Sequence, residues 1–243
     1  NFNEPKVEWF KGGQLNITEN ALDRHLESKG DQAAIIWEPS NPEEKAITLT
    51  YKELHSKVSE FANVLLANGV QKGDRVCIYM PMIPELAIAC LACARVGAVH
   101  SVVFAGFSAS ALADRVNDAE AKIVLTSDGN YRGAKNIPVK SVVDTACESA
   151  DCVETVIVVN RTGADVLMKD GRDKWWHEEI AKVNDKNEAV AVDAEDMLFI
   201  LYTSGSTGQP KGVVHTTAGY MVYTDYTFRN AFQYQEGEVY WCT

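Results

Sequence analysis

Ten consecutive residues near the end of the chain combine glycines, hydroxyl side chains and one cation, and they read Thr203-Ser-Gly-Ser-Thr-Gly-Gln-Pro-Lys-Gly212. Glycine lets a backbone approach a ligand closely and adopt positive φ, so that neighbouring N–H groups can converge on an anion. The hydroxyls add hydrogen-bond donors, and Lys211 adds a mobile positive charge that suits phosphate. The segment therefore predicts a phosphate-binding loop.

This segment differs from the P-loop of Walker-type nucleotide hydrolases, which requires Gly, four residues and then Gly-Lys-Ser/Thr. Pro210 precedes Lys211 and Gly212 follows it, so the spacing and the metal-binding hydroxyl are both missing. A flexible Gly/Ser linker between domains is the structural alternative. The apolar stretches at 197–201 and 213–214 favour the phosphate loop, because they flank the segment as strands would flank a loop within one domain.

The composition is that of an ordinary globular protein, with 46% hydrophobic and 23% charged residues in a chain of 243. The chain has 34 Asp and Glu residues and 23 Lys and Arg residues, which gives a formal net charge of −11. This negative balance argues against a nucleic acid or an anionic membrane as partner. No apolar run approaches the ~20 residues that span a bilayer. Anionic ligands must be held by local cations and backbone N–H groups.

Cys90 and Cys93 form a Cys-x-x-Cys, a spacing that elsewhere indicates a redox or zinc site. They lie in the apolar, helical pattern of residues 85–95, and no second Cys or His pair stands at ligand spacing. Core packing is therefore the preferred interpretation, and no metal ligand is predicted. The thiol content favours a reducing compartment, and we expect the protein to be cytoplasmic.

Apolar strands alternate with helical patterns, which predicts parallel βαβ units: an α/β fold of parallel sheets flanked by helices. A short helix is expected near residues 21–30, and the strand at 197–201 is expected to be buried on both faces. Helix starts are predicted at a Thr50/Glu53 capping box, at Pro84, at Ser108 and at Thr216 or Thr217. The main strands are expected at 33–37, 75–79, 98–104, 122–125, 153–159, 197–202 and 239–243.

Trp175 and Trp176 stand together in the polar stretch 160–196. Adjacent tryptophans either dock a helix onto a core or stack on a base, and docking is the preferred interpretation. The chain begins without Met and ends at Thr243 inside an expected strand. We therefore expect a fragment of a longer protein.

The ten-residue segment resembles the signature of the acyl-adenylate-forming superfamily, and the match is complete from Thr203 to Gly212. Further stretches resemble its acetyl-CoA synthetase branch and the related propionyl-CoA synthetases; they lie at 75–108, 171–177, 213–216 and 240–243. The resemblance implies a ligase that uses ATP to convert acetate to acetyl-AMP. Transfer of the acetyl group to CoA would then give acetyl-CoA, with AMP and pyrophosphate as the other products.

Site residues are carried over by the same resemblance. The ATP phosphates would be bound by Thr203, Ser204, Gly205, Ser206, Thr207, Gly208 and Lys211. CoA would be bound by Phe104, Ala105, Gly106, Arg132, Gly133, Ala134, Lys135 and Ile137. The family more often has glycine at position 105 and arginine at position 135. Because lysine lacks the bidentate guanidinium fork, this departure bears on CoA affinity. Mg²⁺ is implied with ATP, without a dedicated carboxylate site.

The resemblance assigns residues 1–243 to part of an N-terminal AMP-binding domain, with residues 1–30 as its N-terminal extension. The acyl pocket, the adenine and ribose contacts and the small C-terminal domain with its catalytic lysine are expected outside this sequence. No catalytic residue is therefore predicted within it, and the fragment alone is expected to be inactive. Two other functions stay open: a non-catalytic nucleotide-binding module, and an adenylating domain that serves a carrier-protein thiol. Propionate as the acid and the oligomeric state are also left open.

Overall fold

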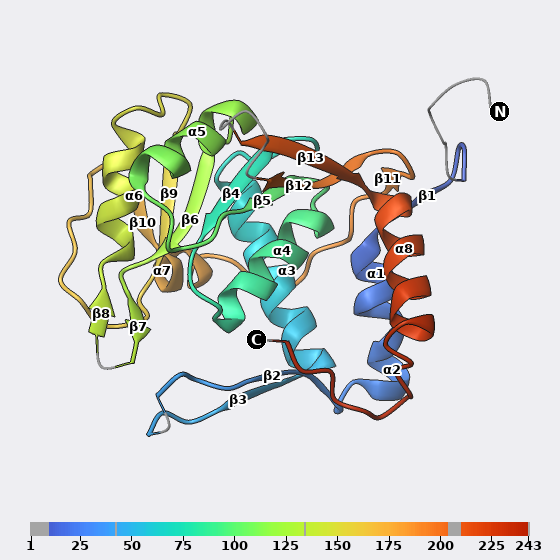
Figure 1. Ribbon diagram of the computed structural model, residues 1–243. Helices are drawn as coiled ribbons and strands as arrows, with labels where there is room; N and C mark the ends of the chain where they lie inside the picture. The colour runs from blue at the N-terminus through green and yellow to red at the C-terminus, as the bar shows by residue number, and fades with distance from the viewer. Residues whose placement is uncertain (1–9, 42, 134, 204–209, 243) are drawn as a thin grey trace.

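The computed structural model describes residues 10–41, 43–133, 135–203 and 210–242 (Figure 1). Its centre is a seven-stranded sheet in the order β10-β9-β6-β4-β5-β12-β13. Neighbouring strands run parallel except for β12 and β13, which are antiparallel. The strands are β4 (Arg75–Tyr79), β5 (Val99–Val102), β6 (Ile123–Ser127), β9 (Thr155–Val159), β10 (Asp173–Trp175), β12 (Met197–Thr203) and β13 (Lys211–Thr216). The predicted parallel α/β fold is confirmed.

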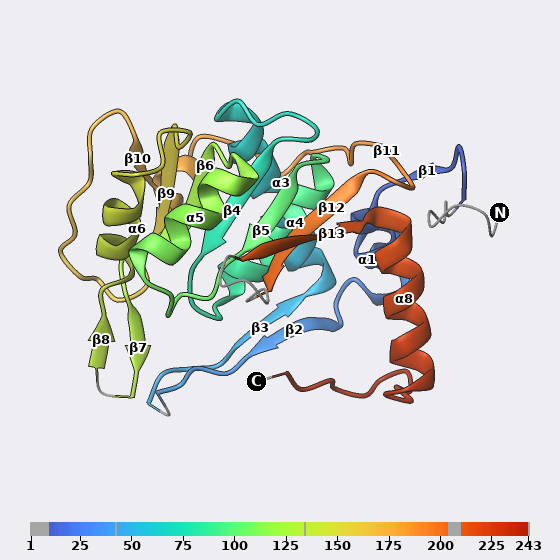
Figure 2. The same ribbon diagram turned by 45° about the horizontal axis from the view of Figure 1, so that its top comes forward.

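Helices cover both faces of this sheet (Figures 1 and 2). They are α3 (Tyr51–Ala67), α4 (Pro84–Arg95), α5 (Ala109–Ala119), α6 (Val139–Cys147), α7 (Trp176–Ile180) and α8 (Thr217–Asn230). Val76 and Ile78 of β4 pack with α3 and α4, whereas Cys77 and Tyr79 pack with α5 and α6. Alternate residues of a strand point to opposite faces, so the buried strand contributes to two separate cores.

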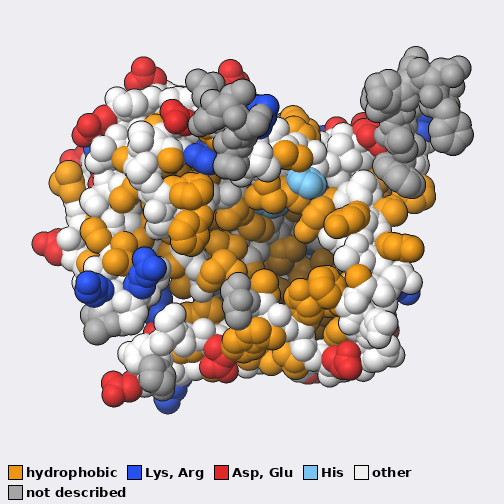
Figure 3. All heavy atoms as spheres, viewed as in Figure 1, with side chains coloured by type: hydrophobic (Ala, Val, Ile, Leu, Met, Phe, Trp, Pro, Cys, Tyr) orange, Lys and Arg blue, Asp and Glu red, His pale blue; other side chains and the backbone are white. Residues whose placement is uncertain are grey.

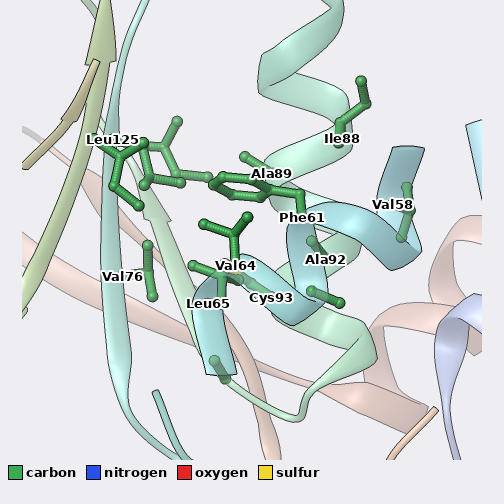
Figure 4. Close-up of a cluster of buried hydrophobic side chains, with 14 of the residues drawn as sticks. Val58, Phe61, Val64, Leu65, Val76, Ile88, Ala89, Ala92, Cys93 and Leu125 are labelled. Atoms are coloured by element: carbon green, nitrogen blue, oxygen red, sulfur yellow. The ribbon is translucent and has the colours of Figure 1, made fainter. Parts of the chain in front are cut away.

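The core under α3 and α4 is built from interleaved apolar side chains (Figure 4). Phe61, Val64 and Leu65 of α3 lie between the sheet and α4, and all three are buried. The Trp176 ring of α7 stacks on Phe61, with the ring centroids 3.6 Å apart and an interplanar angle of 11°. Docking of the tryptophan pair onto the core is confirmed.

Local signals begin and end the helices as predicted. Thr50 and Glu53 form the capping box of α3, and Gly69 beyond its end has a φ of +80°. Pro84 occupies the first turn of α4, where a backbone N–H would have no acceptor within the helix, so the missing N–H of proline costs no hydrogen bond. Ser108 caps α5 by accepting a hydrogen bond from the Ala111 N–H at 3.3 Å. These helix starts depend on a few neighbouring residues, which is why spacing alone identified them.

The expected helix near residues 21–30 is instead three short turns: α1 (Ile17–Ala21), a 3₁₀ turn (Asp23–His25) and α2 (Leu26–Lys29). Asn16 caps α1, and its side-chain amide donates to the carbonyls of Ala94, Arg95 and Val190. Asp23 pairs with the buried Arg95, at 2.8 Å from Nη1. These contacts with the end of α4 determine the shape of the segment, although the paired residues lie 72 to 79 residues apart in the sequence.

Three short two-stranded antiparallel sheets complete the described structure: β1 (Gln14–Leu15) with β11 (Val192–Asp193), β2 (Ala33–Trp37) with β3 (Ile47–Thr50), and β7 (Asn130–Arg132) with β8 (Lys135–Ile137). Within the described residues, no helix combines the length and the apolar character needed to cross a membrane.

Two expectations about strands are wrong. The strand at 197–201 is not buried on both faces, because Met197 and Leu201 are each 43% exposed. It pairs with the edge strand β13, whose Val213 and Val214 are also exposed, so this end of the sheet has less cover than its centre. The expected strand at 239–243 is irregular and exposed over residues 239–242, where it has no pairing partner among the described strands.

Candidate functional site

The candidate ligand-binding segments follow the carboxyl ends of three strands of the central sheet. Residues 103–107 follow β5, the β7–β8 hairpin follows β6, and residues 204–210 follow β12. Because β4, β5, β6 and β12 are parallel, these ends share one edge of the sheet. The helices after β4 and β5 lie on opposite faces, and ligands of open α/β sheets bind beside such a pair of strands.

At the predicted phosphate loop, β12 and β13 form an antiparallel pair in which Thr203 lies opposite Lys211. Lys211 is exposed and Thr203 is exposed beside it. The structure therefore brings these two predicted contacts together at the end of the hairpin where the connecting loop begins and ends. The other five predicted contacts, Ser204, Gly205, Ser206, Thr207 and Gly208, lie outside the described residues.

Tyr202 fastens the base of this loop to α5. Its hydroxyl donates to Asp118 at 2.6 Å, and its pKa is raised by burial and by that carboxylate. Across the hairpin, Gly212 packs so closely that a Cβ there would lie 3.0 Å from Ile200 and 3.2 Å from the Tyr202 ring. The two strands that carry Thr203 and Lys211 are thus held in a fixed position relative to α5.

The loop after β5 contains Phe104, Ala105 and Gly106, the first group of predicted CoA contacts. The sequence pattern predicted a strand to residue 104, but β5 ends at Val102, which frees Phe104 to lie 71% exposed. A Cβ at Gly106 would fall 2.4 Å from this ring, so the turn accommodates the phenyl group best with glycine there. The loop is anchored by the Tyr79 hydroxyl, which donates to the Phe107 carbonyl at 2.7 Å.

Arg115 of α5 connects these two segments, and the sequence patterns missed it. Its guanidinium lies 4.7 Å from the centroid of the Phe107 ring and 5.7 Å from that of Tyr202. Both distances are within cation–π range. Nothing in the spacing of α5 identifies Arg115, because its partners, Phe107 in the loop after β5 and Tyr202 in β12, are brought together only by the fold.

The second group of predicted CoA contacts lies on the β7–β8 hairpin. Arg132 and Lys135 are directly opposite each other in register and both are exposed. Gly133 follows with a φ of +59°, in the left-handed region that favours glycine at such a turn. Ile137 is half-buried at the base, and Ala134 lies outside the described residues. In Figure 3, Lys and Arg side chains gather at the lower left, over this hairpin.

The described donor set fits a nucleotide that carries phosphates. Two adjacent cations can bind phosphate, and an exposed aromatic ring can stack on a base. Among the described residues, no three His, Cys, Asp or Glu side chains gather as metal ligands do. A magnesium ion bound together with ATP needs few protein ligands, because phosphates and water complete its coordination.

Cys90 and Cys93 pack into the core formed by α3 and α4. Cys93 is fully buried and Cys90 is half-buried, and both are free thiols. Burial raises the pKa of Cys90 to about 12 and raises that of Cys93 well above its ordinary value. A thiol in this state is a poor nucleophile at neutral pH. The interpretation of this pair as core packing is confirmed.

Residues 22–243 match the family described as AMP-binding enzyme. A protein of Halorhodospira halophila named acetyl-coenzyme A synthetase is 55% identical over 237 residues, which cover 98% of this chain and 37% of that protein. Its namesake in Desulfatibacillum aliphaticivorans is 56% identical over 239 residues, or 98% of this chain and 36% of that protein. The protein of the same name in Bdellovibrio bacteriovorus is 51% identical over 243 residues, which cover 100% of this chain and 38% of that protein. The chain therefore spans 36–38% of the length of these relatives.

Proposed function

This chain belongs to the family of AMP-binding enzymes, and we propose that the whole protein is an acetate–CoA ligase that forms AMP. In the proposed reaction, a carboxylate oxygen of acetate attacks the α-phosphorus of ATP and displaces pyrophosphate. The CoA thiol then attacks the carbonyl carbon of acetyl-AMP and releases AMP. The identity of 51–56% to proteins named acetyl-coenzyme A synthetase supports acetate as the acid.

The observation that carries the proposal is the pairing of Thr203 with Lys211 at the carboxyl edge of the sheet. The amino group of Lys211 would neutralise charge on the phosphates as pyrophosphate leaves. The residues between this pair, 204–208, complete the proposed phosphate contacts. Mg²⁺ is proposed to accompany ATP, where it would neutralise part of the phosphate charge.

For CoA we propose the exposed ring of Phe104, with Ala105 and Gly106, and the cations of the β7–β8 hairpin. Gly133, Ala134 and Ile137 would complete this surface. The net charge of −11 gives such a local pair of cations a clear role, because the rest of the molecule repels a polyanion. The remaining parts of the active site are proposed to lie in the longer protein, and residues 1–30 to form an N-terminal extension.

The decisive experiment measures acid-dependent exchange of labelled pyrophosphate into ATP in the full-length protein, with formate, acetate, propionate and butyrate compared at equal concentration. We expect acetate to give the highest kcat/KM, and addition of CoA to yield acetyl-CoA. Exchange that is fastest with propionate would reassign the acid. No exchange with any acid would refute adenylation and favour a nucleotide-binding module.

The acceptor is tested separately by supplying acetyl-AMP with either CoA or a carrier protein that bears a phosphopantetheine thiol. The exposed cations Arg132 and Lys135 favour free CoA, because its nucleotide end carries phosphates that a carrier protein lacks. Thioester formation on the carrier protein alone would contradict the proposed acceptor. The cytoplasm is the proposed compartment, supported by six cysteines that are all free thiols.

A further inference from the structure

Arg161, two residues beyond β9, contacts one carboxylate and two aromatic rings. Its Nη1 and Nη2 donate to the two carboxylate oxygens of Glu44 at 2.5 and 2.7 Å. The same guanidinium lies 5.1 Å from the ring centroid of Trp37 and 5.1 Å from that of Tyr131. A bidentate ion pair enclosed by two rings fixes the orientation of the planar group.

These partners come from two different hairpins. Trp37 ends β2 and Glu44 lies in the turn between β2 and β3, whereas Tyr131 is the middle residue of β7. Figures 1 and 2 both show the outer end of the β2–β3 hairpin beside the β7–β8 hairpin. Trp37 is itself held from the other side, since its Nε1–H donates to the Met82 carbonyl in the loop after β4 at 2.7 Å.

The position of Arg161 is set by Asp128, a fully buried carboxylate between β6 and β7. Asp128 accepts hydrogen bonds from the backbone N–H groups of Arg161, Thr162 and Ala164 at 2.8 to 3.0 Å. Burial alone would raise the pKa of Asp128, but these bonds hold it below its ordinary value, so the carboxylate stays ionised. One side chain thus fixes both the start of the β7–β8 hairpin and the loop that carries Arg161.

Two proposed CoA contacts depend on this arrangement. Arg132 directly follows Tyr131, and Lys135 is paired with Arg132 across the hairpin. A two-stranded hairpin is only marginally stable by itself, so its direction relative to the sheet must be set by contacts elsewhere. Two contacts of this kind are the cation–π contact of Tyr131 with Arg161 and the hydrogen bond from the Tyr131 hydroxyl to the Thr162 carbonyl at 3.4 Å.

We propose that Arg161, clamped by Glu44, Trp37 and Tyr131, is a positioning residue that orients the β7–β8 hairpin so that Arg132 and Lys135 together meet the phosphates of CoA. This inference rests on the proposed CoA site. It assigns a role in CoA binding to the β2–β3 hairpin, which contributes no predicted CoA contact of its own. Because Arg161 acts through other residues, its loss affects the CoA-dependent step and spares adenylation of the acid.

The test compares both half-reactions in the full-length protein for Arg161→Ala, Arg161→Lys and Glu44→Gln. We expect Arg161→Ala to raise the KM for CoA by ~5–20-fold, the size of a coupling between contacting residues, and to leave acetate-dependent pyrophosphate exchange within about twofold. Arg161→Lys retains the charge but not the fork, so it should restore only part of the affinity. Glu44→Gln removes the ion pair without touching the loop, which covers the case in which Arg161→Ala fails to fold.

Arg75→Ala is the matched control, because Arg75 also pairs with a glutamate, Glu120 at 2.8 Å, at the opposite edge of the sheet. Its KM for CoA should not change. Equal losses in both half-reactions of the Arg161 and Glu44 variants would show a general structural role and overturn the proposal.

A mutant cycle separates this inference from the CoA site itself. If Arg161 acts through the hairpin, adding Arg161→Ala to the variant Arg132→Ala/Lys135→Ala, which has lost both cations, should leave its KM for CoA nearly unchanged. Fully additive effects would overturn the positioning role. If Arg132→Ala raises the KM for CoA and Arg161→Ala does not, the positioning role of Arg161 is refuted and the proposed CoA site is retained. If neither variant changes the KM, the proposed CoA site is wrong, and the positioning role that rests on it is refuted as well.

Discussion

Among single residues, Lys211 has the clearest proposed role, since it brings a positive charge beside Thr203 at the end of the hairpin. Lys211→Ala should lower acetate-dependent pyrophosphate exchange in the full-length protein by ~10–100-fold, as expected for the loss of one charge-assisted contact to a phosphate. Lys186→Ala removes another exposed lysine, from a loop outside the candidate site, and should have no effect. Normal exchange in Lys211→Ala would show that this lysine is only a surface residue.

Arg132 and Lys135 are predicted to hold the nucleotide end of CoA, away from the acyl-transfer chemistry. Arg132→Ala should raise the KM for CoA by about tenfold and spare the adenylation half-reaction. Lys135→Arg supplies a bidentate fork and should lower that KM. Both effects should shrink at high salt, because these charges are exposed. An equal loss of both half-reactions in Arg132→Ala would instead mark the residue as structural.

Among the elements, α4 gives the sharpest prediction, because its two cysteines lie against the core of α3. Cys93→Ser would bury a hydroxyl without a partner and should lower the free energy of unfolding by about 1–3 kcal/mol. Cys93→Ala keeps the site apolar and should cost less than serine. Urea denaturation of the three proteins checks the order.

The same helix predicts the thiol reactivity of the folded chain. At pH 8, Cys90 and Cys93 should resist a thiol reagent, because burial raises the pKa of both thiols, whereas the exposed Cys242 should react. Rapid labelling of Cys90 and Cys93 in the native protein, or stoichiometric zinc bound to them, would contradict core packing.

At the scale of the whole molecule, stability depends on a buried ionic network that joins α6 to β10, the edge strand of the central sheet. The side chain of Asp173 is fully buried, and its carboxylate accepts hydrogen bonds from Lys140 at 2.7 Å and from Arg172 at 2.5 Å. Burial alone would raise the pKa of Asp173, but these cations hold it below its ordinary value. The ionised carboxylate therefore stabilises the fold above about pH 4, and this stabilisation is lost as the pH falls through the lowered pKa.

Asp173→Asn should lower the free energy of unfolding by ~3–5 kcal/mol at pH 7, because it leaves buried cations without their partner. Below about pH 4, the free energy of unfolding should also decrease less in the variant than in the parent protein. Thermal unfolding between pH 2.5 and 7 measures both effects. Asp225→Asn, in the exposed pair with Arg229, is the control and should change stability by less than about 1 kcal/mol. Similar pH profiles for the parent and Asp173→Asn would contradict the role of this network.

The sequence by itself determined the α/β fold, the starts of α3, α4, α5 and α8, and the segment that is proposed to bind phosphate. Caps such as Thr50 with Glu53 involve residues three apart, and the alternation of strands and helices leaves few arrangements for the chain. The glycines, hydroxyls and lysine of residues 203–212 are likewise contiguous. Each of these features depends on chemistry within a few residues, which a sequence displays directly.

Only the tertiary structure decided which distant residues meet. The guanidinium of Arg161 pairs with Glu44, 117 residues away, and that of Arg115 contacts Phe107 of a loop and Tyr202 of a separate strand. It also decided that Leu201 is exposed, since burial in a strand depends on its neighbours in the sheet as well as on its own side chains. Strand order is set by packing between elements, and no local spacing encodes it. The contacts proposed to orient the CoA site are therefore invisible in the sequence and follow from the order of strands in the sheet.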